Sequence, residues 1–156
     1  MEYKSQRLYR DARIFSIYEG TTQLQVVAAI RYISNGTMLN NIKEMLAALP
    51  AEANAALKAR VEKLIPVYED ALNYAKGLGN QDAFDFLARR LYDMTCELVM
   101  SLLIIRDAAK CPELFEKSAN VYVRMTEEDV CGKSAYIKNF QVEDLEAFKA
   151  AESAEA

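Results

Sequence analysis

The residues best suited to chemistry lie around Glu19, in a short break between two helical patterns. Apolar Phe15 and Tyr18 precede this carboxylate, and Gly20 follows it, so a ligand could approach the backbone closely. A carboxylate held in such a turn can act as a general base if water is excluded. Burial would raise its pKa and the following helix N-terminus would lower it, so the net direction is open. The alternative is that Glu19 is an ordinary solvated turn residue.

Other catalytic and metal-binding arrangements fit the sequence poorly. The chain has no His, which excludes Ser-His-Asp catalysis and His-ligated zinc within it. Cys96, Cys111 and Cys131 form no CxxC pair, so we expect free thiols in a reducing compartment, acting as small buried hydrophobic residues. The acidic run 127–129 would diverge around a helix, which favours a solvated surface over a metal site. Lys58, Arg60 and Lys63 are likewise expected on a solvated helix face, and we expect no metal.

The stretch RDARIFSIYEGTTQLQ, residues 10–25, resembles the C-terminal signature of the acyl-CoA dehydrogenases. The resemblance implies that Glu19 removes the α-proton of an acyl-CoA thioester. The β-hydrogen would leave as hydride to FAD, giving the trans-enoyl-CoA. It also implies that Tyr18 and Gly20 line the substrate pocket, and that Thr21 and Gln23 contact the FAD cofactor. Electron-transferring flavoprotein would be the partner that accepts the electrons.

The resemblance also divides the chain into two parts. Residues 1–35 are similar to the end of the catalytic C-terminal domain. Residues 37–156 are similar, in position, length and helical pattern, to the additional helical domain of the larger family members. No flavin-holding β-domain or Gly-rich phosphate loop is present in the sequence. We therefore expect a C-terminal fragment that is inactive alone. The alternative is a non-catalytic helical interaction or self-association module, and a homo-oligomer is expected in either case.

The elements that must position these residues are predicted to be helices. Gly and Pro are scarce, at five and three residues, while hydrophobic residues make up 52%. Thr21 or Thr22 can cap a helix that ends at Asn35-Gly36, and Thr37 can cap the next one. Pro66 predicts a kink or two abutting helices, and Gly132 predicts an interruption. The predicted segments are 3–17, 21–34, 37–49, 51–76, 81–109, one that begins at Pro112, and a short piece at 142–149.

The longest segment carries the clearest apolar stripe. Its members recur at steps of three and four: Phe84, Leu87, Leu91, Met94, Leu98, Leu102 and Ile105. The helix after Pro112 would contribute Leu114, Phe115, Ala119, Tyr122 and Val123. Such stripes predict an all-α, up-and-down helical bundle of four to five main helices, preceded by a short helix-loop-helix.

Charge and hydropathy limit the possible partners. The formal net charge is −4, which disfavours non-specific nucleic-acid binding, and Arg89-Arg90 is too small a patch to bind phosphate. The N-terminus lacks the apolar stretch of a signal peptide. The longest dense apolar run, 98–105, is too short to span a bilayer, which needs about 20 residues. We expect a cytoplasmic protein without a membrane span.

Overall fold

The computed structural model describes residues 4–16 and 21–147, and these residues are almost entirely helical. Within these residues no strand occurs, which confirms the all-α prediction. A further helical turn covers residues 142–147. The helices are α1 (Lys4–Arg13), the 3-10 turn η1 (Ile14–Ser16), α2 (Thr22–Ser34), α3 (Thr37–Ala47), α4 (Ala55–Gly77), α5 (Gln81–Lys110) and α6 (Pro112–Asn139).

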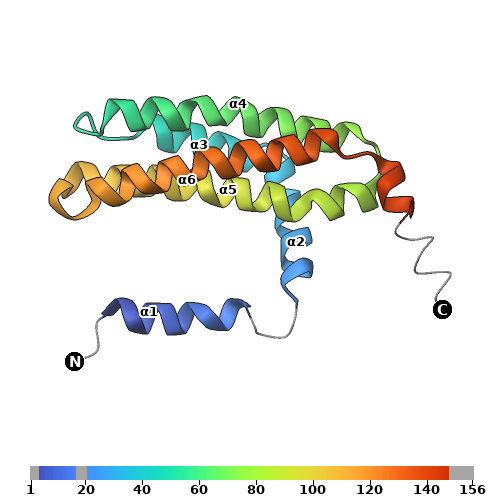
Figure 1. The fold of residues 1–156 in the computed structure, drawn as a ribbon, viewed down its shortest axis with the longest axis horizontal. Coiled ribbons are helices and arrows are strands. Elements are labelled where there is room, and N and C mark those ends of the chain that lie inside the picture. Colours follow the sequence, from blue (N-terminus) through green and yellow to red (C-terminus); the bar gives the residue numbers. More distant parts are fainter. Residues whose placement is uncertain (1–3, 17–20, 148–156) are drawn as a thin grey trace.

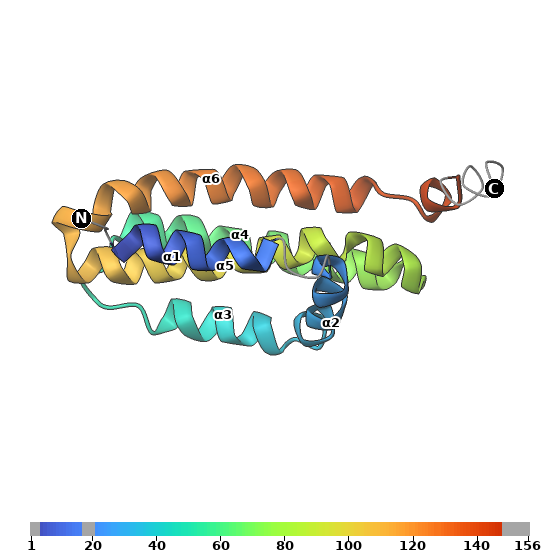
Figure 2. The same ribbon diagram turned by 90° about the horizontal axis from the view of Figure 1, so that it is seen from below.

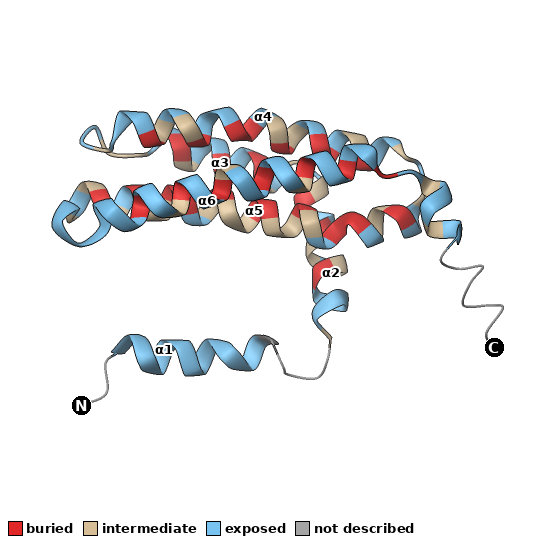
Figure 3. Ribbon diagram, viewed as in Figure 1, coloured by how far each residue is buried: buried red, intermediate tan, exposed pale blue. Residues whose placement is uncertain are grey.

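Helices α3 to α6 form an up-and-down bundle, as the stripes predicted. Figures 1 and 2 show α3, α4, α5 and α6 side by side with alternating directions, while α2 runs across them and α1 stands apart. Figure 3 shows the consequence for burial: red residues concentrate inside the bundle, and α1 is exposed along its whole length. None of residues 10–15 and 21–25 is buried, so they lie outside the core of the bundle.

The core is centred on α5, which contacts α2, α3, α4 and α6. The predicted stripe is confirmed from Leu87 to Ile105, where every member is 1% exposed or less, and Phe84 is half-buried at the end of the bundle. Tyr68 of α4 is fully buried among these residues. Burying one such large side chain contributes about 1.5–3 kcal/mol, so this helix dominates the packing.

Asparagine side chains cap α4 and α5, whereas the N-cap of α3 is Gly36, without a side-chain capping bond. The backbone N–H of Thr37 donates to Asn35 Oδ1 at 2.9 Å, and that of Ala83 donates to Asn80 Oδ1 at 2.9 Å. Neither Thr21 nor Thr37 supplies the predicted hydroxyl cap: Thr21 precedes α2 without a side-chain capping bond, and Thr37 is already helical. Gly36 has a φ of +90°, which confirms the predicted left-handed turn at that position.

Two predicted breaks do not occur. Helix α4 continues through Pro66 as one element, so the alternative of two abutting helices is wrong. Pro66 and Glu62 are both exposed, which lets water bind the Glu62 carbonyl oxygen that has lost its backbone donor. Helix α6 likewise continues through Gly132. Packing of neighbouring α6 residues such as Val130 and Ser134 outweighs the roughly 1 kcal/mol cost of a helical glycine.

The first turns of α6 and the cysteines also differ from expectation. Leu114 and Phe115 are 67% and 38% exposed, whereas Ala119 and Val123, predicted for the same stripe, are buried. The three cysteines are free thiols, as predicted, but none is in the core. Cys96 and Cys111 are half-buried and Cys131 is exposed, so the prediction of small buried hydrophobic residues is wrong.

Candidate functional site

The candidate site lies where the chain passes from η1 to α2. Tyr18, Glu19 and Gly20 fall outside the described residues. The structure therefore defines the flanks of their turn, Ser16 on one side and Thr21 on the other. Four residues, 17–20, connect these two flanks.

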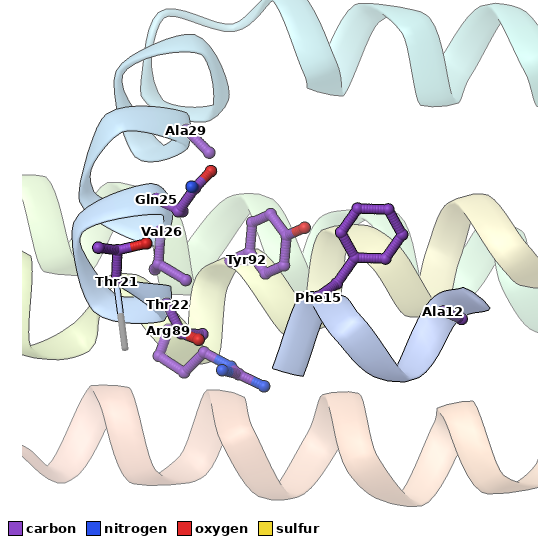
Figure 4. Close-up of a pocket in the computed structure, with 9 residues that line it drawn as sticks. All are labelled: Ala12, Phe15, Thr21, Thr22, Gln25, Val26, Ala29, Arg89 and Tyr92. Atoms are coloured by element: carbon purple, nitrogen blue, oxygen red, sulfur yellow. The ribbon is translucent and has the colours of Figure 1, made fainter. Parts of the chain in front are cut away.

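A pocket of about 760 Å³ lies beside these flanks, between α1, η1, α2 and α5. Figure 4 shows its lining, which we call the motif pocket: Ala12, Phe15, Thr21, Thr22, Gln25, Val26, Ala29, Arg89 and Tyr92. Hydroxyl and amide groups come from the start of α2, and a guanidinium and a phenol come from α5. None of these lining residues carries a carboxylate, so a base acting in the pocket would have to come from elsewhere.

The two predicted FAD-contacting residues lie differently with respect to this pocket. Thr21 is half-buried, lines the pocket, and its carbonyl oxygen accepts a hydrogen bond from the Gln25 N–H at 3.0 Å. Gln23 is exposed, and its Nε2 donates to the Asp85 carbonyl oxygen at 3.2 Å. That bond connects α2 to α5.

The α5 side of the motif pocket supplies neutral and cationic groups. Arg89 Nε donates to Asp93 Oδ1 at 2.8 Å, one turn further along the helix, in an exposed ion pair. Contact with the Cys96 thiol raises the pKa of Tyr92, and burial raises the pKa of Cys96. Both groups therefore remain protonated at neutral pH. The pocket can donate hydrogen bonds and offer one positive charge.

Sequence reasoning missed the α5 contribution. Arg89 belongs to a basic pair that is too small to predict a phosphate site, and Tyr92 lies off the apolar stripe of α5. Both are more than sixty positions from Thr21 and Gln25, so only the docking of α2 against α5 brings them together. Their spacing of three places them on one face of a helix, which is the signal that could have paired them.

A second, apolar hollow of about 350 Å³ adjoins the motif pocket. The two share Ala29 and Tyr92. Beyond them this hollow is lined mainly by apolar side chains of α2, α3 and α5, including Tyr32, Met38 and Met100. Polar groups thus concentrate near Thr21, and apolar groups lie further along α2.

The acidic run does not form a metal site. Glu127 receives two hydrogen bonds from Arg60 of α4, one of them at 2.8 Å from Nε, which corrects the expectation that Arg60 is simply solvated. Asp129 lies 3.8 Å from the Lys133 Nζ. Across residues 4–16 and 21–147, no group of three His, Cys, Asp or Glu side chains could hold a metal ion. Nor is any helix in those ranges long and apolar enough to cross a bilayer.

Comparisons with known proteins place these features in a family. A family profile described as "Acyl-CoA dehydrogenase C terminal" matches residues 34–145. A similar solved structure is that of an acyl-CoA dehydrogenase family protein from Porphyromonas gingivalis, at 28% sequence identity and a TM-score of 0.66. The match covers 73% of this chain and 98% of that chain. No curated protein sequence matches. Arg89 and Tyr92 lie inside the profile match, whereas Thr21 and Gln25 precede it.

Proposed function

The chain belongs to the acyl-CoA dehydrogenase family, through the C-terminal domain of that family, and from this premise we propose that it is the C-terminal part of an FAD-dependent enzyme. The reaction is the α,β-dehydrogenation of an acyl-CoA thioester to the trans-enoyl-CoA. The observation that carries the proposal is the motif pocket, whose lining includes Phe15 and Thr21, the described residues on either side of Glu19 in the sequence. Residues 1–35 would complete the catalytic domain, and residues 37–156 would form the additional helical domain.

Glu19 is the proposed base. The described lining of the motif pocket holds hydroxyl, amide, phenol and guanidinium groups but no carboxylate, so Glu19 would supply the missing proton acceptor. The α-proton of a thioester is very weakly acidic, and its removal needs a carboxylate aligned with the substrate. In the sequence, Glu19 lies between the described helical segments η1 and α2. Tyr18 and Gly20 would line the substrate pocket next to it.

The described residues fit one edge of a flavin dinucleotide. Hydroxyls of Thr21 and Thr22 and the Gln25 amide can bind polar groups, and the Arg89 guanidinium suits an anionic one. When bound, FAD supplies the hydride acceptor. Gln23 is proposed to add a contact through its Oε1, since its Nε2 is bonded to α5. These side chains would hold and orient the cofactor.

We also propose the electron acceptor, the compartment and the oligomeric state from the family match. The enzyme would pass electrons to an electron-transferring flavoprotein, act in the cytoplasm and form a homo-oligomer. It would belong to fatty acid metabolism, with an acyl-CoA as substrate. Support for these assignments comes from the family match and the signature around Glu19.

The test is the substitution Glu19→Gln in the enzyme that contains this domain. Gln has nearly the same shape but cannot accept the proton, so we expect dehydrogenation to fall by about 100-fold or more while the protein remains yellow with bound flavin. The matched control is Glu52→Gln, at an exposed position between α3 and α4, which should leave the rate unchanged. Activity of Glu19→Gln within a few-fold of the parent would refute the assignment.

A second candidate function is a self-association module, because α1, η1 and α2 expose large apolar side chains. Phe15 is 81% exposed and Leu24 is 70% exposed. Association through this surface should be weakened by Leu24→Glu and detected by light scattering over a range of concentrations. Association that is unaffected by Leu24→Glu would exclude this surface.

A further inference from the structure

The outward side of α6 carries a second apolar stripe, separate from the one in the core. Leu114, Val121 and Met125 are 67%, 62% and 55% exposed. Their steps of seven and four continue to Gly132, seven positions further, so all four lie along one line of the helix surface. We call this line the α6 outer face. The core-facing residues of α6, from Ala119 to Ile137, occupy the opposite side.

Gly132 on this face has no explanation within one chain. It is exposed in the middle of a helix, and a Cβ added there would meet nothing within 4 Å. Its φ is not in the left-handed region, so no turn requires glycine. A glycine at such a position costs about 1 kcal/mol relative to alanine. A flat spot on a helix has a use when another helix or side chain must approach the backbone closely.

The α6 outer face is self-complementary when two copies run antiparallel. Leu114 and Gly132 are equally far from Val123 in the sequence, and so are Val121 and Met125. A two-fold axis at the level of Val123 therefore sets the Leu114 of each copy against the Gly132 of the other. It also sets Val121 against Met125. In this arrangement the Leu114 side chain packs on the Gly132 backbone, and the Val121 and Met125 side chains pack against each other.

The charges beside this face agree with the same arrangement. Lys117 and Glu128 flank the same side of the outer face, and the two-fold axis brings the Lys117 of one copy near the Glu128 of the other. Within the described residues Lys117 makes no ion pair, and Glu128 makes only an exposed one, with Arg124 at 3.7 Å. A parallel arrangement would oppose Lys117 to Lys117 and Gly132 to Gly132, which is unfavourable in charge and leaves a void.

We propose that the α6 outer face binds a second copy of this chain as an antiparallel helix pair. The contact would join two bundles through α6, at a distance from the motif pocket, and it does not depend on the proposed enzymatic function. A single helix pair lies at the small end of specific interfaces, so we expect a weak dimer, with a Kd on the order of 100 μM. The exposed apolar surface of α1 and α2 is a competing site, which the test separates.

The test is sedimentation velocity on the whole chain at about 10 μM to 1 mM, the range that brackets such a dissociation constant. Gly132→Leu should raise the Kd about 10-fold or more, because the added side chain occupies the space that Leu114 needs. Lys117→Glu and Glu128→Lys should each weaken the dimer, and the double variant should restore it. Circular dichroism checks that each variant retains the helical fold.

The control is Glu62→Lys, an equal charge reversal at an exposed position of α4, which should not change the dimer. A chain that stays monomeric up to about 1 mM would overturn the proposal. So would a dimer that survives Gly132→Leu, or one that Leu24→Glu abolishes while Gly132→Leu leaves it intact. Failure of the charge-swapped double variant to restore association would also count against the antiparallel register.

Discussion

The hydroxyl groups of Tyr68 on α4 and Thr95 on α5 are hydrogen-bonded at 2.9 Å inside the bundle. Thr95 Oγ1 also lies 2.8 Å from the carbonyl oxygen of Leu91, one turn earlier on its own helix. Tyr68 is fully buried and Thr95 is 3% exposed. Because the polar atoms have few other partners at this depth, the pair favours one alignment of α4 against α5.

Tyr68→Phe should lower the free energy of unfolding by about 1 kcal/mol. The substitution keeps the ring in the core and removes one buried hydrogen bond, while Thr95 retains its bond to Leu91. Urea denaturation followed by circular dichroism measures the change. Tyr9→Phe, at a residue that is 74% exposed, is the control and should be neutral. An equal loss in both variants would show that the buried bond is unimportant.

The Arg60–Glu127 pair should make stability depend on pH. Its hydrogen bonds from Arg60 lower the pKa of Glu127 below its ordinary value of 4.5. A carboxyl with a lowered pKa in the folded state stabilises the protein above the unfolded pKa and loses that effect as the pH falls through the folded pKa. Glu127→Gln should therefore cost about 0.5–1 kcal/mol at pH 7, a value that allows for solvent screening.

The measurement is urea denaturation of both proteins between pH 7 and pH 3. The difference between parent and Glu127→Gln should shrink below pH 4.5. The control is Glu62→Gln at an exposed position of the same bundle, which should show a smaller difference at every pH. A difference that is constant over this range would mean that the charge of Glu127 is not responsible.

Substitution of Lys133 should lower the free energy of unfolding most at a pH where Glu97 is ionised. Lys133 Nζ donates to Glu97 Oε1 at 2.8 Å, while Glu97 Oε2 is buried and has no partner among the described residues. Burial raises the pKa of Glu97, and Lys133 opposes that rise. Lys133→Met would leave a partly buried carboxylate without its cation, so we expect a loss of about 1–2 kcal/mol at pH 7.

Lowering the pH should reduce the loss of stability caused by Lys133→Met. Without Lys133 the pKa of Glu97 rises further, and the folded state binds a proton more readily than the unfolded state does. Stability of Lys133→Met should therefore increase relative to the parent as the pH falls from 7 to 5. Lys110→Met, at an exposed residue at the end of α5, serves as the control. A loss for Lys133→Met that is the same at both pH values would contradict the assignment.

Substitution by alanine should change stability in opposite directions at Gly132 and Gly79. Gly132→Ala should stabilise the monomer by about 0.5–1 kcal/mol, since the position is helical and the added Cβ meets nothing within 4 Å. Gly79→Ala should destabilise it by about 1 kcal/mol, because Gly79 has a φ of +63°. Denaturation at low micromolar concentration isolates the monomer. Changes of the same sign would show that backbone conformation does not set these effects.

The sequence was most informative where one pattern extends over many residues. The stripe from Leu87 to Ile105 is long enough to predict α5 and its buried face. The predicted interruption at Gly132 is wrong because the cost of a glycine in a helix, about 1 kcal/mol, is small compared with the packing energy of the 28-residue helix α6. The capping error has a similar origin: Thr37 is a good cap by residue type, but the left-handed backbone at Gly36 makes Gly36 the N-cap of α3.

The candidate site was predictable only in its contiguous part. The signature around Glu19 is a single run of sequence and therefore visible without a fold. Arg89 and Tyr92 join it only because α2 crosses α5. The pairing of Arg60 with Glu127 joins residues 67 positions apart, and no local spacing distinguishes it from ordinary surface charge. Contacts between distant helices depend on the whole packing of the bundle, which explains why they were missed.

The last prediction concerns the chain by itself: it should bind neither FAD nor acyl-CoA tightly. Tight binding of such a cofactor needs an enclosed site with fixed donors to its phosphates and ring. The motif pocket is lined by residues of α1, η1, α2 and α5 together with Thr21, and Phe15 is 81% exposed to solvent at its edge. Water at that edge would weaken every electrostatic contact of the bound group. Arg89, the cation of the lining, is already paired with Asp93.

Titration of the purified chain with FAD, followed by flavin fluorescence, measures this directly. We expect no saturable binding in the micromolar range, and no enoyl-CoA when an acyl-CoA and an electron acceptor are added. Arg89→Ala provides the matched control, because a true site would lose affinity with that substitution while non-specific quenching would not. Saturable binding that Arg89→Ala weakens would show that residues 1–156 form a complete flavin site, and the proposal of a C-terminal part would then have to be abandoned.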